Sequence, residues 1–113
     1  MGKIKVIKIP VDSDPFVVEV DTTLEAMQAA IGGGYIEIVP INQQGLELLC
    51  DEEGKIKGLT PNVLIFGGLD SVCGDCLLLR HDEEGEAASV TDADIQQVMG
   101  KWTGRKAGTL PIV

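Results

Sequence analysis

Short aliphatic runs separated by polar turns dominate the first 80 positions of the chain, and this pattern predicts a series of β-strands. The expected strands span residues 3–9, 16–20, 35–41, 46–50, 63–66 and 73–80. Turn residues at 12–15 and 42–45 predict that the first two strands form one hairpin and the next two another. The segment 63–66 is apolar throughout, so it is expected to be either a strand buried on both faces or an edge at an interface.

Between the second and third expected strands, the apolar spacing becomes that of an amphipathic helix. Three residues share its apolar face: Leu24, Met27 and Ile31. Thr22 and Glu25 fit a capping box, in which a hydroxyl and a carboxylate three residues apart accept hydrogen bonds from unpaired backbone N–H groups. The glycines at 32–34 are expected to end this helix, because glycine adopts the left-handed conformation that closes a helix.

A second helix is expected near the C-terminal end of the sequence. Thr91 is its predicted cap, with Asp94 three residues later, and Val90 and Ile95 are placed to form a hydrophobic staple. Its apolar face is predicted to carry Ile95, Val98, Met99 and Trp102.

Strands with two interspersed helices and hairpin-length turns predict an α+β fold, a mostly antiparallel sheet with two helices packed on it. The 113-residue length and the absence of repeats predict one compact domain over residues 1–103. Residues 104–113 are expected to be a flexible or partner-engaging C-terminal tail.

The charge of the chain is strongly negative and unevenly distributed. There are 18 acidic residues against 9 Lys and Arg, and residues 46–95 hold most of the acids. Such a chain is not expected to bind nucleic acid or an anionic membrane directly, but a basic protein surface remains a possible partner. The candidate acidic surface comprises Asp51, Glu52, Glu53, Asp82, Glu83, Glu84 and Glu86. The alternative is that these residues are solvated loop tips that only keep the protein soluble.

Targeting signals do not change this picture. The N-terminal residues lack the pattern of a secretory signal, and no apolar run approaches the roughly 20 residues that span a bilayer. Three cysteines, an odd number, do not form a disulfide framework. A cytoplasmic protein with reduced thiols is therefore expected.

The cysteines offer one candidate metal site. Cys73, Cys76 and His81 have the spacing of the first three ligands of a zinc knuckle, but the fourth position is Glu86. Cys50 would complete the set only if the fold brings it close. The same pair would be a redox motif only if a helix followed it, and a strand is expected there. Buried thiols are the favoured alternative, so we expect no cofactor.

Catalytic chemistry has little support in the sequence. His81 stands beside Asp82 and could be oriented as a general base, but no nucleophile accompanies it. A solvated histidine in an acidic turn is the simpler interpretation, and we expect no enzyme activity. A small ligand would instead be held by the backbone of a turn next to a strand, for which the candidates are Gly58, Leu59, Thr60, Pro61 and Asn62.

Several local strings occur in a familiar order: residues 35–40, the acidic turn and loop at 51–62, the pair at 74–75, and residues 89–95. Together they resemble an uncharacterised family of small α+β proteins carried by bacteriophages, plasmids and conjugative elements, often near antirestriction genes. The likeness covers about residues 3–99. The resemblance implies no catalytic residue.

Two departures from the family pattern bear on function. Cys73 and Cys76 stand where the pattern has aliphatic or aromatic residues, which makes them core replacements and weakens the zinc hypothesis. The arginine expected after Asn62 is replaced by the apolar run 63–66.

The sequence thus predicts a non-enzymatic binding protein of a phage or mobile element that sequesters or blocks a host component. Its partner is either a host protein that meets the acidic surface or a small nucleotide-like ligand. A homo-oligomeric scaffold is the first alternative, because the apolar run 63–66 and the segment 110–113 resemble edges that pair with partners. The small zinc-binding protein is the second.

Overall fold

The computed structural model describes residues 2–41, 45–102 and 110–111. Its larger sheet has the strand order β2-β1-β7-β4-β3, with β8 added to β7, and every pair is antiparallel. The bounds are β1 Lys3–Ile9, β2 Phe16–Asp21, β3 Ile36–Pro40, β4 Leu46–Asp51, β7 Cys76–His81 and β8 Ala87–Ala88. The expected pairing of the first two strands, and of the next two, is confirmed. Residues 42–44 of the second predicted turn lie outside the described residues.

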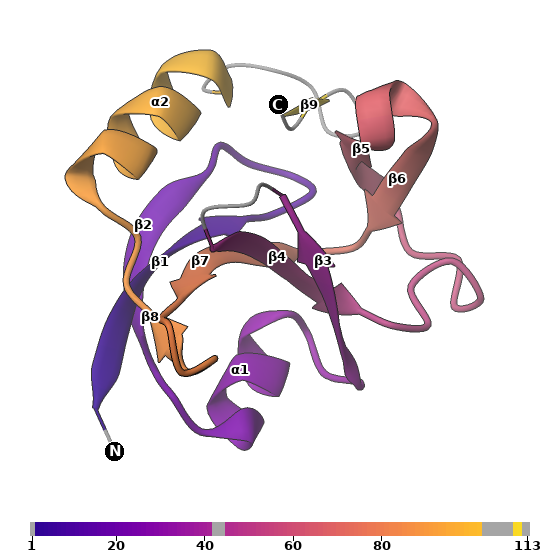
Figure 1. Cartoon of the computed structure of the whole chain (residues 1–113). Helices are drawn as coiled ribbons and strands as arrows, with labels where there is room; N and C mark the ends of the chain where they lie inside the picture. The colour runs from indigo at the N-terminus through magenta and orange to yellow at the C-terminus, as the bar shows by residue number, and fades with distance from the viewer. Residues whose placement is uncertain (1, 42–44, 103–109, 112–113) are drawn as a thin grey trace.

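A smaller sheet has the order β6-β5-β9, with bounds β5 Pro61–Ile65, β6 Asp70–Cys73 and β9 Leu110–Pro111. The short 3-10 turn η1, Phe66–Gly68, joins β5 to β6. The helices are α1, Leu24–Ala30, and α2, Asp92–Trp102. Figure 1 shows α1 on one side of the larger sheet, and α2 and the β5–β6 hairpin on the other.

The larger sheet is buried on both faces around its central strand, β7. Leu77 and Leu79 pack with Met27 and other residues on the α1 side. Leu78 packs on the opposite side, in the cluster that contains Val63 of β5 and residues of α2. A strand covered on both faces needs apolar side chains in both directions. This is why the sequence of β7 has three consecutive leucines where a half-exposed strand would alternate.

The sheet is mostly antiparallel, but the predicted packing of two helices on that one sheet is wrong. The described residues form nine strands and two helices of 7 and 11 residues, so sheet dominates the molecule. The β5–β6 hairpin covers much of the face that a helix was expected to cover, and Val63, Ile65 and Val72 supply its buried side chains. The sequence interpretation missed this layer because it treated 63–66 as an isolated strand.

The expected strand at 73–80 is also wrong, because it is two strands. Gly74 interrupts it with φ of 92°, a left-handed conformation that glycine tolerates best. The N–H of Gly74 donates to the carbonyl of Thr60 at 2.8 Å, so the chain turns there. Cys73 ends β6, and Cys76 begins β7 in the other sheet.

The first helix begins one residue later than predicted. Thr23 is the N-cap, and its hydroxyl accepts a hydrogen bond from the N–H of Ala26 at 3.2 Å, so the expected box of Thr22 and Glu25 is wrong. Leu24 is 59% exposed and does not belong to the buried face, whereas Met27 is buried as expected. The predicted glycine stop is confirmed, since all three glycines have positive φ.

The second helix begins as predicted. The hydroxyl of Thr91 accepts a hydrogen bond from the N–H of Asp94 at 3.1 Å, and the N–H of Thr91 donates to the Asp94 carboxylate at 2.9 Å. Val98 is buried, and Ile95 and Met99 pack beside it. The side chain of Trp102 lies outside what the structure describes.

Most of the predicted tail, residues 104–109 and 112–113, falls outside the described residues, so the expected boundary at 103 stays a prediction. Leu110 and Pro111 form β9, which pairs in parallel with Val63 and Leu64 of β5. Across the residues that the structure describes, no helix combines the length and the apolar character needed to cross a membrane.

Candidate functional site

A cavity of about 280 Å³ opens between the two sheets, and we call it the interlayer cavity. Four consecutive residues of β3, 37–40, line one side, and four consecutive residues of β6, 70–73, line the other. Phe66 from η1, Cys50 from β4 and Lys55 from the loop after β4 also line the cavity. The cavity therefore forms only when two segments that are separated by residues 41–69 fold together.

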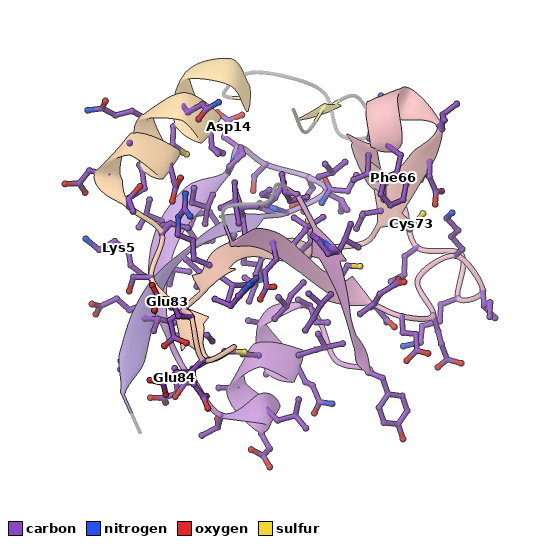
Figure 2. All side chains as sticks on the ribbon, in the orientation of Figure 1. Lys5, Asp14, Phe66, Cys73, Glu83 and Glu84 are labelled. Atoms are coloured by element: carbon purple, nitrogen blue, oxygen red, sulfur yellow. The ribbon has the colours of Figure 1, made fainter. Side chains whose placement is uncertain are left out.

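Phe66 is the most unusual residue of the lining. Its φ of 53° makes it the only described non-glycine residue in the left-handed region, which costs a bulky residue about 1–2 kcal/mol. Phe66 is also 62% exposed, so burial does not offset that cost. Figure 2 shows Phe66 and Cys73 on the same side of the molecule, at the β5–β6 hairpin. Backbone strain that supports an exposed aromatic side chain is a common feature of binding sites.

The polar part of the lining is acidic. Lys55 forms an ion pair with Asp70, whose carboxylate also accepts a hydrogen bond from the N–H of Ser71 at 2.8 Å. The hydrogen bond from Lys55 lowers the pKa of Asp70. Glu37, Asp51 and Glu52 add three further carboxylates to the lining. Among the described residues of the lining Lys55 is the only base, and it is already paired.

Two of the three thiols line the interlayer cavity, Cys50 from one sheet and Cys73 from the other. The thiol of Cys50 lies 3.8 Å from the carbonyl oxygen of Glu37 and donates to it. Burial raises the pKa of Cys50 to about 12, with a smaller contribution from the carboxylate of Glu37. This thiol is therefore protonated at neutral pH and is a poor nucleophile.

A second cavity of about 270 Å³ lies beside the end of α1. Leu59 and Thr60 of the predicted ligand-binding segment line it, together with Lys57. Asp51 lines both cavities and forms part of the wall between them. The predicted turn thus borders this second cavity and not the one that carries Phe66.

Asn62, another residue of that predicted segment, is fully buried. Its Nδ2 donates hydrogen bonds to the carbonyls of Ile9 at 2.8 Å and Gly74 at 2.9 Å. The amide thus joins β5 to the end of β1 and to the β6–β7 turn. Its Oδ1 is buried with no partner among the described residues. Gly58 and Pro61, in contrast, are exposed.

The fold brings Cys50 and Cys73 of the candidate zinc set to one cavity, but it separates His81 from the cysteines. Cys76 begins β7 and His81 ends it, about 17 Å apart at about 3.3 Å per residue. Cys76 is buried, and its thiol lies 3.9 Å from the carbonyl of Ile9. His81 Nδ1 lies 2.9 Å from Glu47 Oε2, so its partner is not Asp82. Among the described residues no group of three His, Cys, Asp or Glu side chains could hold a metal ion.

The candidate acidic surface is divided between two places. Asp51 lies at the end of β4. The turn at 82–86 follows β7, whose end pairs with the start of β4. The two turns are therefore about 20 Å apart along the strands. Figure 2 shows Glu83 and Glu84 beside β8, away from the β5–β6 side. Asp51 itself is buried, whereas Glu52, Glu53 and residues 82–84 and 86 are exposed.

The comparison with known protein families identifies the family of the chain. A model described as "Domain of unknown function (DUF3846)" matches residues 4–103. The chain belongs to the DUF3846 family. No curated protein and no solved structure matches it. The DUF3846 match includes every residue that lines the two cavities.

The sequence interpretation missed four residues that line the interlayer cavity, namely Glu37, Lys55, Phe66 and Asp70. One signal was present: Phe66 follows an apolar run and precedes two glycines, a pattern typical of a sharp turn that leaves an aromatic ring at the surface. The other three are polar residues in separate segments, and only the fold brings them to one cavity.

Proposed function

We propose that this DUF3846 protein is a non-enzymatic binding protein of a phage or mobile element, acting in the cytoplasm, that blocks a host protein. We propose the interlayer cavity as the binding site. The observation that carries the proposal is Phe66, an exposed aromatic side chain on a strained backbone at the rim of a cavity. Aromatic anchors beside a pocket supply much of the energy of protein interfaces.

The charge of the lining favours a basic protein segment over a nucleotide. A bound nucleotide would bring phosphates close to Glu37, Glu52 and Asp70, and the base Lys55 is already paired with Asp70. Phosphate recognition relies on cations or backbone N–H groups that are available to the ligand. Carboxylates around an apolar cavity instead complement a partner with Lys or Arg side chains.

The state of the thiol supports binding and not covalent chemistry. The thiol of Cys50 lies 4.0 Å from the carboxylate of Glu37, and burial holds it in the protonated form. His81 ends β7 at a distance from this cavity and is not part of its lining. The nucleophile and the base that an acyl-transfer or thiol enzyme would need therefore do not meet in the proposed site.

A homo-oligomeric scaffold has less support than it had from the sequence. Both features that suggested it, the run 63–66 and the segment 110–113, contribute to one pairing within a single chain, β5 with β9. Val63 and Ile65 are buried in the core of that chain. Of the run, Phe66 remains exposed, and we assign it to the binding site.

The test compares two phenylalanine variants. Phe66→Ala removes the proposed anchor, and Phe16→Ala removes the other phenylalanine, which lies on β2 at the opposite edge of the larger sheet. Proteins that immobilised wild type captures from a bacterial extract are purified, and each is tested against wild type, Phe66→Ala and Phe16→Ala. Their dissociation constants are then measured by calorimetry. We expect Phe66→Ala to weaken binding at least about tenfold and Phe16→Ala to leave it nearly unchanged.

Two results would overturn the proposal. Equal binding of every purified candidate by wild type and Phe66→Ala would exclude the cavity as the site. A melting temperature that rises with a nucleotide in wild type, but not in Phe66→Ala, would assign the cavity to a small ligand. The molecular mass in solution of both proteins shows whether Phe66 acts in self-association instead.

A further inference from the structure

The outer edge of β3 borders the interlayer cavity. β3 is the last strand of the larger sheet in the described part of the chain, and β6 is the last strand on its side of the smaller one. Successive side chains of a strand point to opposite faces. Residues 37–40 of β3 and 70–73 of β6 nevertheless line the same cavity. The cavity therefore runs along the backbones of the two strands. The cavity lies between two strand edges.

The hydrogen bonds at the ends of the β3–β4 pairing show which backbone groups face outward. The N–H of Ile41 donates to the carbonyl of Leu46 at 2.9 Å, and the N–H of Glu52 donates to the carbonyl of Tyr35 at 2.9 Å. Along an antiparallel strand, residues alternate between bonding to the partner and facing away from it. Ile38 lies three residues from each end, so its N–H and C=O face away from β4. This edge can accept another strand.

The side chains around the edge combine apolar contacts with negative charge. Ile38 is 55% exposed, Phe66 is exposed at the rim, and Val72 lies in the lining. The carboxylates of Glu37 and Glu52 lie in the same lining. A second copy of this chain carries a net charge of −9 and is repelled from such a site. A positively charged segment is attracted to it.

We propose that the bound partner segment is an extended basic peptide that adds to β3 as a further strand. This inference rests on the proposed function and names the chemistry of the partner at the same site. Backbone bonds to Ile38 hold the peptide in register, and its side chains meet the exposed apolar groups of Ile38 and Phe66 and the carboxylates of Glu37 and Glu52. Strand addition explains why the cavity follows two strand edges.

The test uses a defined peptide probe of about seven residues, Lys-Val-Lys-Val-Lys-Val-Lys with blocked ends, long enough to pair with β3. One comparison peptide replaces every lysine by glutamate, and another carries a methyl group on every backbone amide nitrogen. Two variants of the protein accompany them. Ile38→Pro removes the outward N–H without removing a bond to β4, because edge strands tolerate proline in that position. Ile38→Thr keeps the N–H.

We expect the lysine peptide to bind at least about tenfold more tightly than either comparison peptide. Ile38→Pro should weaken its binding at least about tenfold, and Ile38→Thr should change it less than about threefold. The amide of Ile38 should exchange its hydrogen more slowly when the peptide is bound. Thermal melts of both variants check that they fold. The methylated peptide still tests strand addition if the Ile38→Pro variant does not fold.

Equal binding of the methylated peptide would overturn strand addition, and equal binding of the glutamate peptide would overturn the charge preference. If no peptide binds while a purified host protein still binds in a Phe66-dependent way, this inference fails and the proposed function stands. If neither binds, the proposed function fails as well.

Discussion

Asp51 and Lys57 form an ion pair at the wall between the two cavities. Asp51 is only 6% exposed, and its Oδ2 accepts a hydrogen bond from Lys57 Nζ at 2.7 Å. Its Oδ1 accepts a second bond from the N–H of Glu53 at 2.8 Å. Gly34 leaves room for the pair, because a methyl group there would lie 2.8 Å from both charged atoms. The hydrogen bond from Lys57 lowers the pKa of the Asp51 carboxyl.

Replacement of Asp51 should therefore cost stability. Asp51→Asn removes the charge that Lys57 meets and weakens the bond to the N–H of Glu53, so we expect a loss of about 1–3 kcal/mol in the free energy of unfolding. Glu52→Gln, at the next and exposed position, should change it by less than about 0.5 kcal/mol. Urea unfolding of both variants measures the difference. Equal effects of the two substitutions would show that the Asp51 pair does not stabilise the fold.

The same residue illustrates how far the sequence could predict the structure. Asp51 stands in an acidic run before a glycine, which is typical of a solvated turn, and nothing nearby in the sequence indicates that Lys57 folds back onto it. Local signals gave correct results where neighbours decide the structure, as at Thr91 and Asp94 or the glycines after α1. They failed where distant segments meet, as in the second sheet and the interlayer cavity.

The Arg80–Asp94 ion pair should make stability depend on pH. Arg80 donates to Asp94 at 2.6 Å from Nε and at 2.8 Å from Nη2, and this lowers the pKa of Asp94 to about 2 from an ordinary 3.8. A carboxyl whose pKa is lowered by folding stabilises the folded state above about pH 4, and this stabilisation is lost as the pH falls toward 2. The shift corresponds to roughly 2 kcal/mol.

Urea unfolding of wild type and Asp94→Asn at a series of pH values tests this prediction. Their difference should be largest above about pH 5 and should shrink toward pH 2. Asp92→Asn, at an exposed position in the same helical turn, should cost less than about 1 kcal/mol at neutral pH. A difference between wild type and Asp94→Asn that does not change with pH would contradict the assignment to the carboxylate charge.

Asn62 should be a stability residue and not a ligand residue. Asn62→Ala leaves the buried carbonyls of Ile9 and Gly74 without the amide that donates to both, so we expect a loss of about 2–4 kcal/mol. Thr60→Ala, at an exposed position of the same segment, should cost less than about 1 kcal/mol, since only its backbone carbonyl bonds to Gly74. Chemical unfolding measures both. An Asn62→Ala protein as stable as wild type would refute the role of the amide.

At position 66, the glycine variant should be at least as stable as the alanine variant, which is the reverse of the usual order. At an ordinary position, alanine is more favourable than glycine by about 0.5–1 kcal/mol, but the left-handed φ of Phe66 removes the disadvantage of glycine. Phe66→Gly should therefore be as stable as Phe66→Ala or more stable, by up to about 1 kcal/mol, although neither should bind the partner. Thermal melts of the two variants decide the point. A clearly more stable alanine variant would mean that the backbone is not strained there.

The most direct test of the central claim is amide hydrogen exchange, followed by mass spectrometry, on the protein alone and bound to the host protein identified through the Phe66 and Phe16 variants. If the interlayer cavity is the binding site, exchange slows in residues 36–40 and 66–73 and stays unchanged in the acidic turn at 82–86. Slower exchange confined to that acidic turn, with no change along β3 and β6, would contradict the account.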